Sequence, residues 1–156
     1  MSESAHTHPW KISDVVMFPL LAIGIGLEVF VPSRPEGLPS LAALLPGLFV
    51  IFLGFRLIDW AKFSLDAADQ PSLPGTPTTK LITSDAFSLS RNPNYLGAIL
   101  IALGITIAAQ SLWFLGLTAS GAVLLDRWMI APEECYLSEK FGEDFDAYRQ
   151  KVRRWI

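Results

Sequence analysis

Cysteine and histidine are scarce in this sequence, and their scarcity limits the chemistry that it can support. The single cysteine, Cys135, excludes an internal disulfide and any metal site built from several thiolates. The two histidines, His6 and His8, stand in a polar N-terminal stretch without the acidic or thiolate residues that usually complete a metal site. We therefore predict that the protein holds no metal.

Charge is also scarce. Charged residues make up 17% of the chain, whereas a soluble domain usually carries about a quarter. The net charge of −3 gives no excess of basic residues, so no nucleic-acid partner is expected. Apolar residues account for 51% of the 156 residues. This composition favours one domain, residues 1–156, embedded in membrane lipid.

Four apolar stretches are candidates for helices that cross the bilayer. A spanning helix needs roughly 20 mostly apolar residues, and the pattern predicts spans over residues 15–31, 41–60, 93–109 and 112–130. The last two are predicted to form a hairpin that turns at Ala109-Gln110-Ser111, because one straight helix over the apolar stretch Tyr95–Leu125 would be about 46 Å long. The predicted fold class is all-α, a polytopic membrane protein with four transmembrane helices.

Two polar segments accompany these spans. Residues 66–92 are rich in Pro, Ser, Thr and Asp and are predicted to form a loop with at most short irregular elements. Residues 132–156 form a tail that is not expected to cross the membrane. In this tail Pro132 is predicted to begin a short helix that stops at Gly142, and a second short amphipathic helix follows.

Basic residues are distributed unevenly between the two ends of the spans. With four spans, both termini, the 66–92 loop and the tail share one face. That face carries five basic residues in the tail together with Lys11, Arg56, Lys62, Lys80, Arg91 and Arg127, whereas the other face carries Arg34. The positive-inside rule then places both termini in the cytoplasm. We expect an integral protein of the inner (plasma) membrane of a bacterium.

The start of the third span and the end of the fourth are the candidate site. The hairpin should bring Arg91–Tyr95 close to Arg127–Glu134. Asn92 and Pro93 are typical of a helix start, which attracts anions, and the acidic pair Glu133 and Glu134 suits a cation or hydroxyl groups. A small zwitterionic cofactor with a ribose would satisfy both, although a plain helix cap and acids that complement the helix dipole explain the same residues.

A family resemblance strengthens the first interpretation. The segment Ser90–Gly97 resembles the Arg-His-Pro-x-Tyr-x-Gly signature of integral-membrane methyltransferases, a group that includes the isoprenylcysteine carboxyl methyltransferases and the phospholipid N-methyltransferases. Leu81–Ser84 resembles the stretch that leads into this signature. The family's C-terminal block is resembled by Glu133-Glu134, Phe141-Gly142, Tyr148 and Val152–Trp155. The likeness covers residues 79–156, in the same order and spacing.

The resemblance implies S-adenosylmethionine (S-adenosyl-L-methionine) as the cofactor. The residues that it implies for cofactor binding are Thr79, Lys80, Leu81, Ile82, Phe87, Asn92, Pro93, Asn94, Tyr95, Glu133 and Glu134. Arg91 and Arg127 are candidates to steer an anionic acceptor, although interfacial anchoring explains them as well.

The resemblance also bears on the acceptor and on the partners. It implies membrane lipid and a hydrophobic or lipid-linked methyl acceptor, as in the isoprenylcysteine carboxyl methyltransferases. A phospholipid or small-thiol acceptor is an alternative, as is a non-enzymatic membrane protein on the same scaffold. The oligomeric state stays open.

This sequence departs from the family pattern at several positions. Asn92 replaces the signature histidine, Asp85-Ala86 stands where many relatives have a glycine turn, and Phe87 replaces a tyrosine. The substrate-side arginine of the eukaryotic carboxyl methyltransferases falls on Met129, with Arg127 two residues earlier as a possible substitute. Methyl transfer from a sulfonium depends mainly on alignment of the reactants, so loss of the histidine is compatible with activity.

Overall fold

The computed structural model describes residues 13–33, 40–70 and 78–156. In these ranges the elements are α1 (Ser13–Phe30), α2 (Ser40–Ala67), α3 (Ala86–Leu89), α4 (Pro93–Ala109), α5 (Leu112–Leu124), the π-helical turn η1 (Leu125–Ile130), α6 (Ala131–Phe141) and α7 (Glu143–Lys151). The predicted all-α class is confirmed. His6, His8, Lys11 and Arg34 lie outside the described residues.

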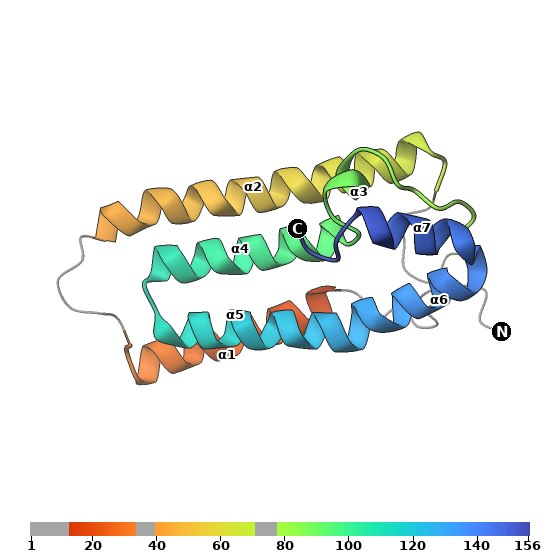
Figure 1. Cartoon of the computed structure of the whole chain (residues 1–156). Coiled ribbons are helices and arrows are strands. Elements are labelled where there is room, and N and C mark those ends of the chain that lie inside the picture. Colours follow the sequence, from red (N-terminus) through yellow and green to blue (C-terminus); the bar gives the residue numbers. More distant parts are fainter. Residues whose placement is uncertain (1–12, 34–39, 71–77) are drawn as a thin grey trace.

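Four long helices lie alongside one another, with α4 in the middle (Figure 1). α4 packs on α2 on one side and on α5 on the other, and α1 lies against α5. The short helix α3, the helices α6 and α7 and the C-terminus gather at the end of the bundle where α4 begins (Figure 1). The fold therefore brings the polar tail to the start of α4.

Within the described residues, three helical segments are long and apolar enough to cross a membrane: Ser13–Phe30, Leu41–Ala67 and Leu112–Phe141. α4 is also apolar, but its 17 residues extend about 26 Å, slightly less than the hydrocarbon thickness. Large apolar side chains are exposed along the outside of the bundle, as at Phe30, Leu41 and Phe63. Exposed apolar surface of this extent is typical of contact with lipid.

The last spanning helix continues beyond the predicted end of the span. α5, η1 and α6 form one continuous helical segment, whereas the sequence predicts a separate helix beginning at Pro132. A proline usually interrupts a helix because it lacks an N–H group and its ring crowds an earlier carbonyl. Here the preceding residues form a π-helical turn, in which the hydrogen-bond spacing is longer. Hydropathy thus predicts where the apolar stretch ends, but not where the helix ends.

The predicted hairpin between α4 and α5 is confirmed. Gln110 ends α4 in the left-handed conformation, with φ 53°. The Ser111 hydroxyl caps α5 by accepting a hydrogen bond from the Phe114 amide. It also donates to the carboxylate of Glu28 near the end of α1, which accepts a second hydrogen bond from the Ser33 hydroxyl. These bonds join α1 to the hairpin.

Close packing of α2 on α4 requires glycine, and this requirement gives a first prediction. A Cβ atom on Gly104 would lie 2.6 Å from the Gly47 carbonyl oxygen and 2.7 Å from the Ile51 nitrogen. Since backbone atoms cannot move aside as a side chain can, we expect Gly104→Ala to separate the helices and lower the free energy of unfolding by about 2 kcal/mol. Thermal unfolding in detergent measures this change.

The matched control is Gly116→Ala on α5. No atom lies within 4 Å of a Cβ built on Gly116, so alanine adds helix propensity without a clash. We expect stability to stay unchanged or to rise by up to about 1 kcal/mol. Equal unfolding temperatures for the two variants would contradict the backbone contact at Gly104.

Candidate functional site

The start of α4 is held by the C-terminal segment of the chain. The buried Ser90 hydroxyl donates a hydrogen bond to the Arg154 carbonyl oxygen (2.9 Å) and accepts one from the backbone N–H of Asn92 (3.1 Å). The Arg91 amide donates to the Arg153 carbonyl oxygen at 3.0 Å. The signature segment and the C-terminal block of the family resemblance therefore meet at this point.

Glu134 joins the charged side chains at this end of the bundle. Its Oε1 atom lies 3.1 Å from Arg91 Nε and 2.9 Å from Arg91 Nη2, and its Oε2 atom lies 2.6 Å from Arg154 Nη2. Arg154 Nη1 also contacts Asp126 Oδ1 at 2.9 Å, and Asn92 Nδ2 lies 3.5 Å from Glu134 Oε1. We call Arg91, Asn92, Asp126, Glu134 and Arg154 the Glu134 cluster. The Arg91 and Glu134 side chains are 12% and 14% exposed, so their ion pair is largely shielded from water.

The two arginines predicted to steer the acceptor lie in different surroundings. Besides the Glu134 carboxylate, the guanidinium of Arg91 contacts the Arg149 and Val152 carbonyl oxygens, both at 3.0 Å. Arg127 lies on η1 with its side chain 78% exposed, 3.9 Å from Asp126. The structure therefore surrounds Arg91 with protein acceptors and places Arg127 at the surface.

Asn92 occupies the N-cap position of α4, as predicted, but its side chain does not cap the helix. The side-chain Nδ2 atom of Asn92 instead donates to Glu134 and to the Arg154 carbonyl oxygen, at 3.5 and 3.4 Å. The expected role of the side chain as a cap is wrong, because its Nδ2 group is directed to the Glu134 carboxylate and the Arg154 carbonyl oxygen and its Oδ1 atom accepts no hydrogen bond from the start of α4. Pro93 is the first residue of the helix, as predicted.

A second contact links α4 to α6. The Tyr95 hydroxyl donates to Glu133 Oε2 at 3.2 Å, and the ring packs in a buried cluster with Val16, Leu125 and Met129. Met129, the position of the family arginine, is therefore part of the apolar packing. The predicted closeness of Arg91–Tyr95 to Arg127–Glu134 is confirmed by this contact and by the Arg91–Glu134 ion pair.

Asn94 allows a test of whether this end of the bundle suits a polar cofactor. Its Oδ1 atom is buried, and no hydrogen-bond donor within the described ranges reaches it. A buried acceptor without a donor costs free energy unless a ligand supplies the donor. S-adenosylmethionine carries such donors in its ammonium, ribose hydroxyl and adenine amino groups. The acceptors at Asn94 and Glu133 therefore fit this cofactor.

The loop segment implied to wrap the cofactor is anchored on the turn that follows α2. Gln70 Oε1 accepts hydrogen bonds from the Thr79 amide (2.7 Å), the Thr79 hydroxyl (3.0 Å) and the Lys80 amide (3.1 Å). Lys80 Nζ donates to the Ala68 carbonyl oxygen at 2.9 Å. Leu81 and Ile82 follow and are half-buried. The hydrogen bonds described for this segment lead to the turn after α2 and not to the Glu134 cluster.

Asp85 keeps a glycine-like conformation at the position where the resemblance suggests a glycine turn. Its φ of 53° lies in the region that favours glycine. The Asp85 carbonyl oxygen accepts hydrogen bonds from the amide (3.0 Å) and the hydroxyl (2.7 Å) of Ser88. These bonds begin α3, where Phe87 packs against the buried side chains of Leu57, Ala61 and Leu96. Asp85 therefore adopts a backbone conformation that glycine adopts more readily.

Tyr148 attaches α7 to α3 and gives a second prediction. Its hydroxyl donates to the Phe87 carbonyl oxygen at 2.6 Å, and burial raises the pKa of Tyr148, so the hydroxyl stays protonated at neutral pH. Tyr148→Phe should lower the free energy of unfolding by about 1 kcal/mol, because the carbonyl loses its donor. The measurement is the unfolding temperature. Tyr136→Phe is the control, since the Tyr136 hydroxyl contacts Lys140 in an exposed position. An equal effect of both would contradict the prediction.

Two members of the Glu134 cluster had no predicted role. Asp126 stands at the end of an apolar stretch, and Arg154 lies in the C-terminal block that matches the family. Their opposite charges are the only feature of the sequence that could have predicted this ion pair. Many other acidic and basic residues in the chain have the same property, so the feature does not select this pair. Their contact follows from the hairpin and from the return of the C-terminal segment to the start of α4 (Figure 1).

Comparison with known proteins identifies the family. Residues 42–144, from the first turn of α2 to the start of α7, match the phospholipid methyltransferase (PEMT) family model. An uncharacterized protein of Haemophilus influenzae is 41% identical over 63 residues, which cover 40% of this chain and 98% of that relative. No solved structure matches the chain. The chain belongs to the phospholipid methyltransferase family, and it is an integral membrane methyltransferase for lipid-related substrates.

Proposed function

We propose that the protein transfers a methyl group from S-adenosylmethionine to a lipid-linked acceptor at the cytoplasmic face of a bacterial inner (plasma) membrane. The observation that carries the proposal is the pair of acceptors at the start of α4. These are the Glu133 carboxylate, bonded to Tyr95, and the buried Asn94 Oδ1 atom, which no described donor reaches. The family match and the distribution of basic residues support the reaction class and the orientation.

Each residue of the site has a distinct role in this proposal. Glu133 and Asn94 accept hydrogen bonds from the cofactor, and Tyr95 orients the Glu133 carboxylate. Glu134 and Arg91 hold the C-terminal segment against α4, and this contact fixes the position of Asn92. The remaining cofactor-binding residues are assigned by the family resemblance: Thr79, Lys80, Leu81, Ile82, Phe87 and Pro93.

The reaction needs positioning more than proton transfer. S-adenosylmethionine, when bound, supplies an electrophilic methyl group on a sulfonium. The protein aligns the acceptor with this group and excludes water from it. Asn92 keeps one protonation state near neutral pH, and its amide donates to Glu134 and to the backbone. Its contribution is therefore to position the start of α4.

An isoprenylcysteine carboxylate is the first acceptor to test. Arg127, exposed on η1, is the arginine available to an anionic acceptor, whereas Arg91 is engaged by Glu134. The family match favours a phospholipid amine as the second candidate, and a small thiol is the third. Transfer of a labelled methyl group to each of the three distinguishes them.

Calorimetric titration tests the cofactor. We expect S-adenosylmethionine and S-adenosylhomocysteine each to bind the detergent-solubilised protein saturably, with one site per chain. Absence of binding by both would reject the enzyme proposal and favour a non-enzymatic role.

The single cysteine tests the orientation. Cys135 is exposed on α6, close to the proposed site. A membrane-impermeant maleimide should label it in inverted vesicles but not in intact cells, with Cys135→Ser as the control. Labelling from outside would contradict the cytoplasmic location.

A further inference from the structure

A buried glutamine fixes the beginning of the loop that the resemblance implies in cofactor binding. Gln70 is 4% exposed, and its Oε1 atom accepts three hydrogen bonds, 2.7 to 3.1 Å long, from Thr79 and Lys80. The Lys80 ammonium adds a fourth bond, to the Ala68 carbonyl oxygen at 2.9 Å. We call these four bonds the Gln70 anchor. They join the loop to the turn after α2.

The end of α2 directs Gln70 into this position. Asp69 adopts the left-handed conformation, with φ 53°, and its N–H donates to the Asp66 carbonyl oxygen at 3.1 Å. The Gln70 N–H donates to the Leu65 carbonyl oxygen at 3.0 Å. This pair of bonds is the Schellman motif, which commonly ends helices. The motif turns the chain back across the last turn of α2, so the glutamine side chain is buried where the loop passes.

The Gln70 anchor divides the loop into a part that is held and a part that is available to a ligand. The backbone N–H groups of Thr79 and Lys80 donate to Gln70, so they cannot donate to a cofactor. Among the described residues, the backbone N–H groups of Leu81 and Ile82 have no acceptor, although both residues are half-buried. Buried backbone donors are costly to leave unpaired. These two amides therefore suit the acceptor groups of S-adenosylmethionine, which are its carboxylate and adenine nitrogens.

The far end of the same loop is fixed independently of Gln70. The Asp85 carbonyl oxygen accepts the hydrogen bonds that begin α3, and the Tyr148 hydroxyl holds the Phe87 carbonyl oxygen. Residues 81–84 therefore bridge two fixed points. Because the Gln70 anchor is the first of these points, it sets where the Leu81 and Ile82 amides lie.

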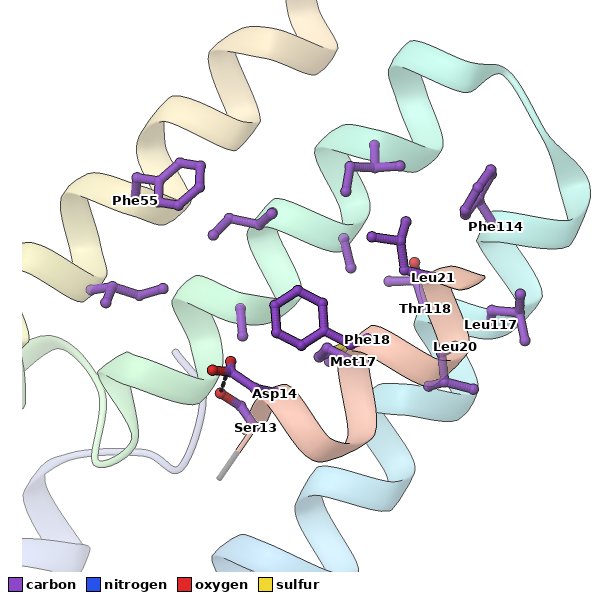
Figure 2. A pocket seen from close by; sticks show the side chains of 15 residues that line it. Ser13, Asp14, Met17, Phe18, Leu20, Leu21, Phe55, Phe114, Leu117 and Thr118 are labelled. Carbon is purple, nitrogen blue, oxygen red and sulfur yellow. Dashed lines mark hydrogen bonds between the residues drawn. The ribbon is translucent and has the colours of Figure 1, made fainter. Parts of the chain in front are cut away.

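An apolar groove beside α4 is separate from this loop (Figure 2). Its volume is about 250 Å³, and its lining residues come from α1, α2, α4 and α5. Phe18 projects into it, and the lining residue Ala98 follows Tyr95 by about one helical turn (Figure 2). Neither Gln70 nor any described residue of the loop lines the groove. A change at Gln70 should therefore alter the loop without altering the groove.

We infer that Gln70 is a positioning residue for the cofactor: it holds Thr79 and Lys80 so that the Leu81 and Ile82 amides are presented to S-adenosylmethionine. This inference rests on the proposed function, and it adds a residue that the family resemblance does not include. Without the anchor the loop samples other conformations. The apparent affinity then falls in proportion to the population of the conformation that binds.

Calorimetric titration of S-adenosylmethionine into the detergent-solubilised protein tests the inference. Gln70→Leu removes the acceptor, and we expect the Kd to rise at least about tenfold, because the loop is no longer held. Gln70→Glu keeps an oxygen acceptor for the same three donors and should hold the Kd within about threefold of the unmodified protein. An unchanged Kd in Gln70→Leu would overturn the inference, as would an equal loss of affinity in the two variants.

Two control variants distinguish positioning from general loosening of the bundle. Ser64 is 4% exposed at the same end of α2, but its hydroxyl donates within the helix, to the Trp60 carbonyl oxygen at 2.8 Å. Ile105 lines the apolar groove. Ser64→Ala and Ile105→Ala should each leave the Kd within about twofold, because neither touches the loop. A loss in either control as large as that in Gln70→Leu would overturn the specific role of Gln70.

Hydrogen exchange of the unmodified protein decides the question if Gln70→Leu does not fold. The Thr79 and Lys80 amides should exchange slowly with and without S-adenosylmethionine, because Gln70 already protects them. The Leu81 and Ile82 amides should become protected when the cofactor binds. Protection of Thr79 and Lys80 that appears only with the cofactor would overturn the inference.

The inference and the proposed function fail in different ways. If the unmodified protein binds no S-adenosylmethionine, the proposed function is rejected. If the unmodified protein binds the cofactor and Gln70→Leu binds it equally well, the role of Gln70 alone is rejected.

Discussion

Glu134→Ala is expected to lower the free energy of unfolding by about 3 kcal/mol, because a buried ion pair would lose one partner. The Glu134 carboxylate accepts hydrogen bonds from both Arg91 and Arg154. Its removal leaves the Arg91 guanidinium, 12% exposed, without an ionic partner. Arg154 is 32% exposed and still pairs with Asp126. We therefore expect a loss of stability at the lower end of the range known for breaking a buried ion pair. We also expect weaker cofactor binding, since the C-terminal segment would no longer fix the start of α4.

Thermal unfolding in detergent measures the loss. An effect of this size should lower the Tm by roughly 6–12 °C. Glu139→Ala is the matched control, because Glu139 is exposed on the same helix, and its substitution should change stability by less than about 0.5 kcal/mol. If Glu134→Ala unfolds at the temperature of the unmodified protein, the Glu134 cluster does not hold this end of the bundle together.

Glu133→Ala should act on binding more than on folding. Glu133 accepts a hydrogen bond from the Tyr95 hydroxyl, whereas Glu134 pairs with two arginines. A hydrogen bond to a charged group contributes about 1.5–3 kcal/mol, so S-adenosylmethionine affinity should fall roughly 10- to 150-fold. Tyr95→Phe removes only the hydroxyl that orients the carboxylate and should reduce affinity by about tenfold or less.

Calorimetry with S-adenosylmethionine and S-adenosylhomocysteine measures both effects. Glu139→Ala again provides the control, with unchanged affinity expected. Both ligands should lose affinity in Glu133→Ala if the carboxylate contacts groups that they share. Unchanged affinity in Glu133→Ala would refute the placement of the cofactor, even if the unmodified protein binds it.

The signals that predicted the fold correctly are local ones. The apolar stretches contain enough residues to form the long helices, and Gln110 and Ser111 supply the turn and cap of the hairpin within a few residues. Pro93 similarly begins α4. Such features depend on neighbours in the chain, so they are visible without the tertiary structure. The continuation of the last helix past Pro132 was missed, because a π-helical turn has no comparable signal.

The candidate site was predicted only in part. The hairpin topology correctly placed Arg91–Tyr95 beside Glu133 and Glu134, and the family resemblance supplied the expected chemistry. The hydrogen-bond partners were not predictable, as Asn92 and Asp126 illustrate. Asn92 turns from the helix end to Glu134, and Asp126 pairs with an arginine from the C-terminal segment.

The amino-acid sequence by itself determined that this is a helical membrane protein, and it placed the family signature at the start of the third span. These properties follow from hydrophobicity along the chain and from residues in a fixed order. Only the tertiary structure decided that Arg91 is engaged by Glu134, that Arg127 is exposed, and that an apolar groove leads away from Tyr95. Ion pairing and cavity shape depend on distances between residues far apart in the chain, and folding alone sets those distances.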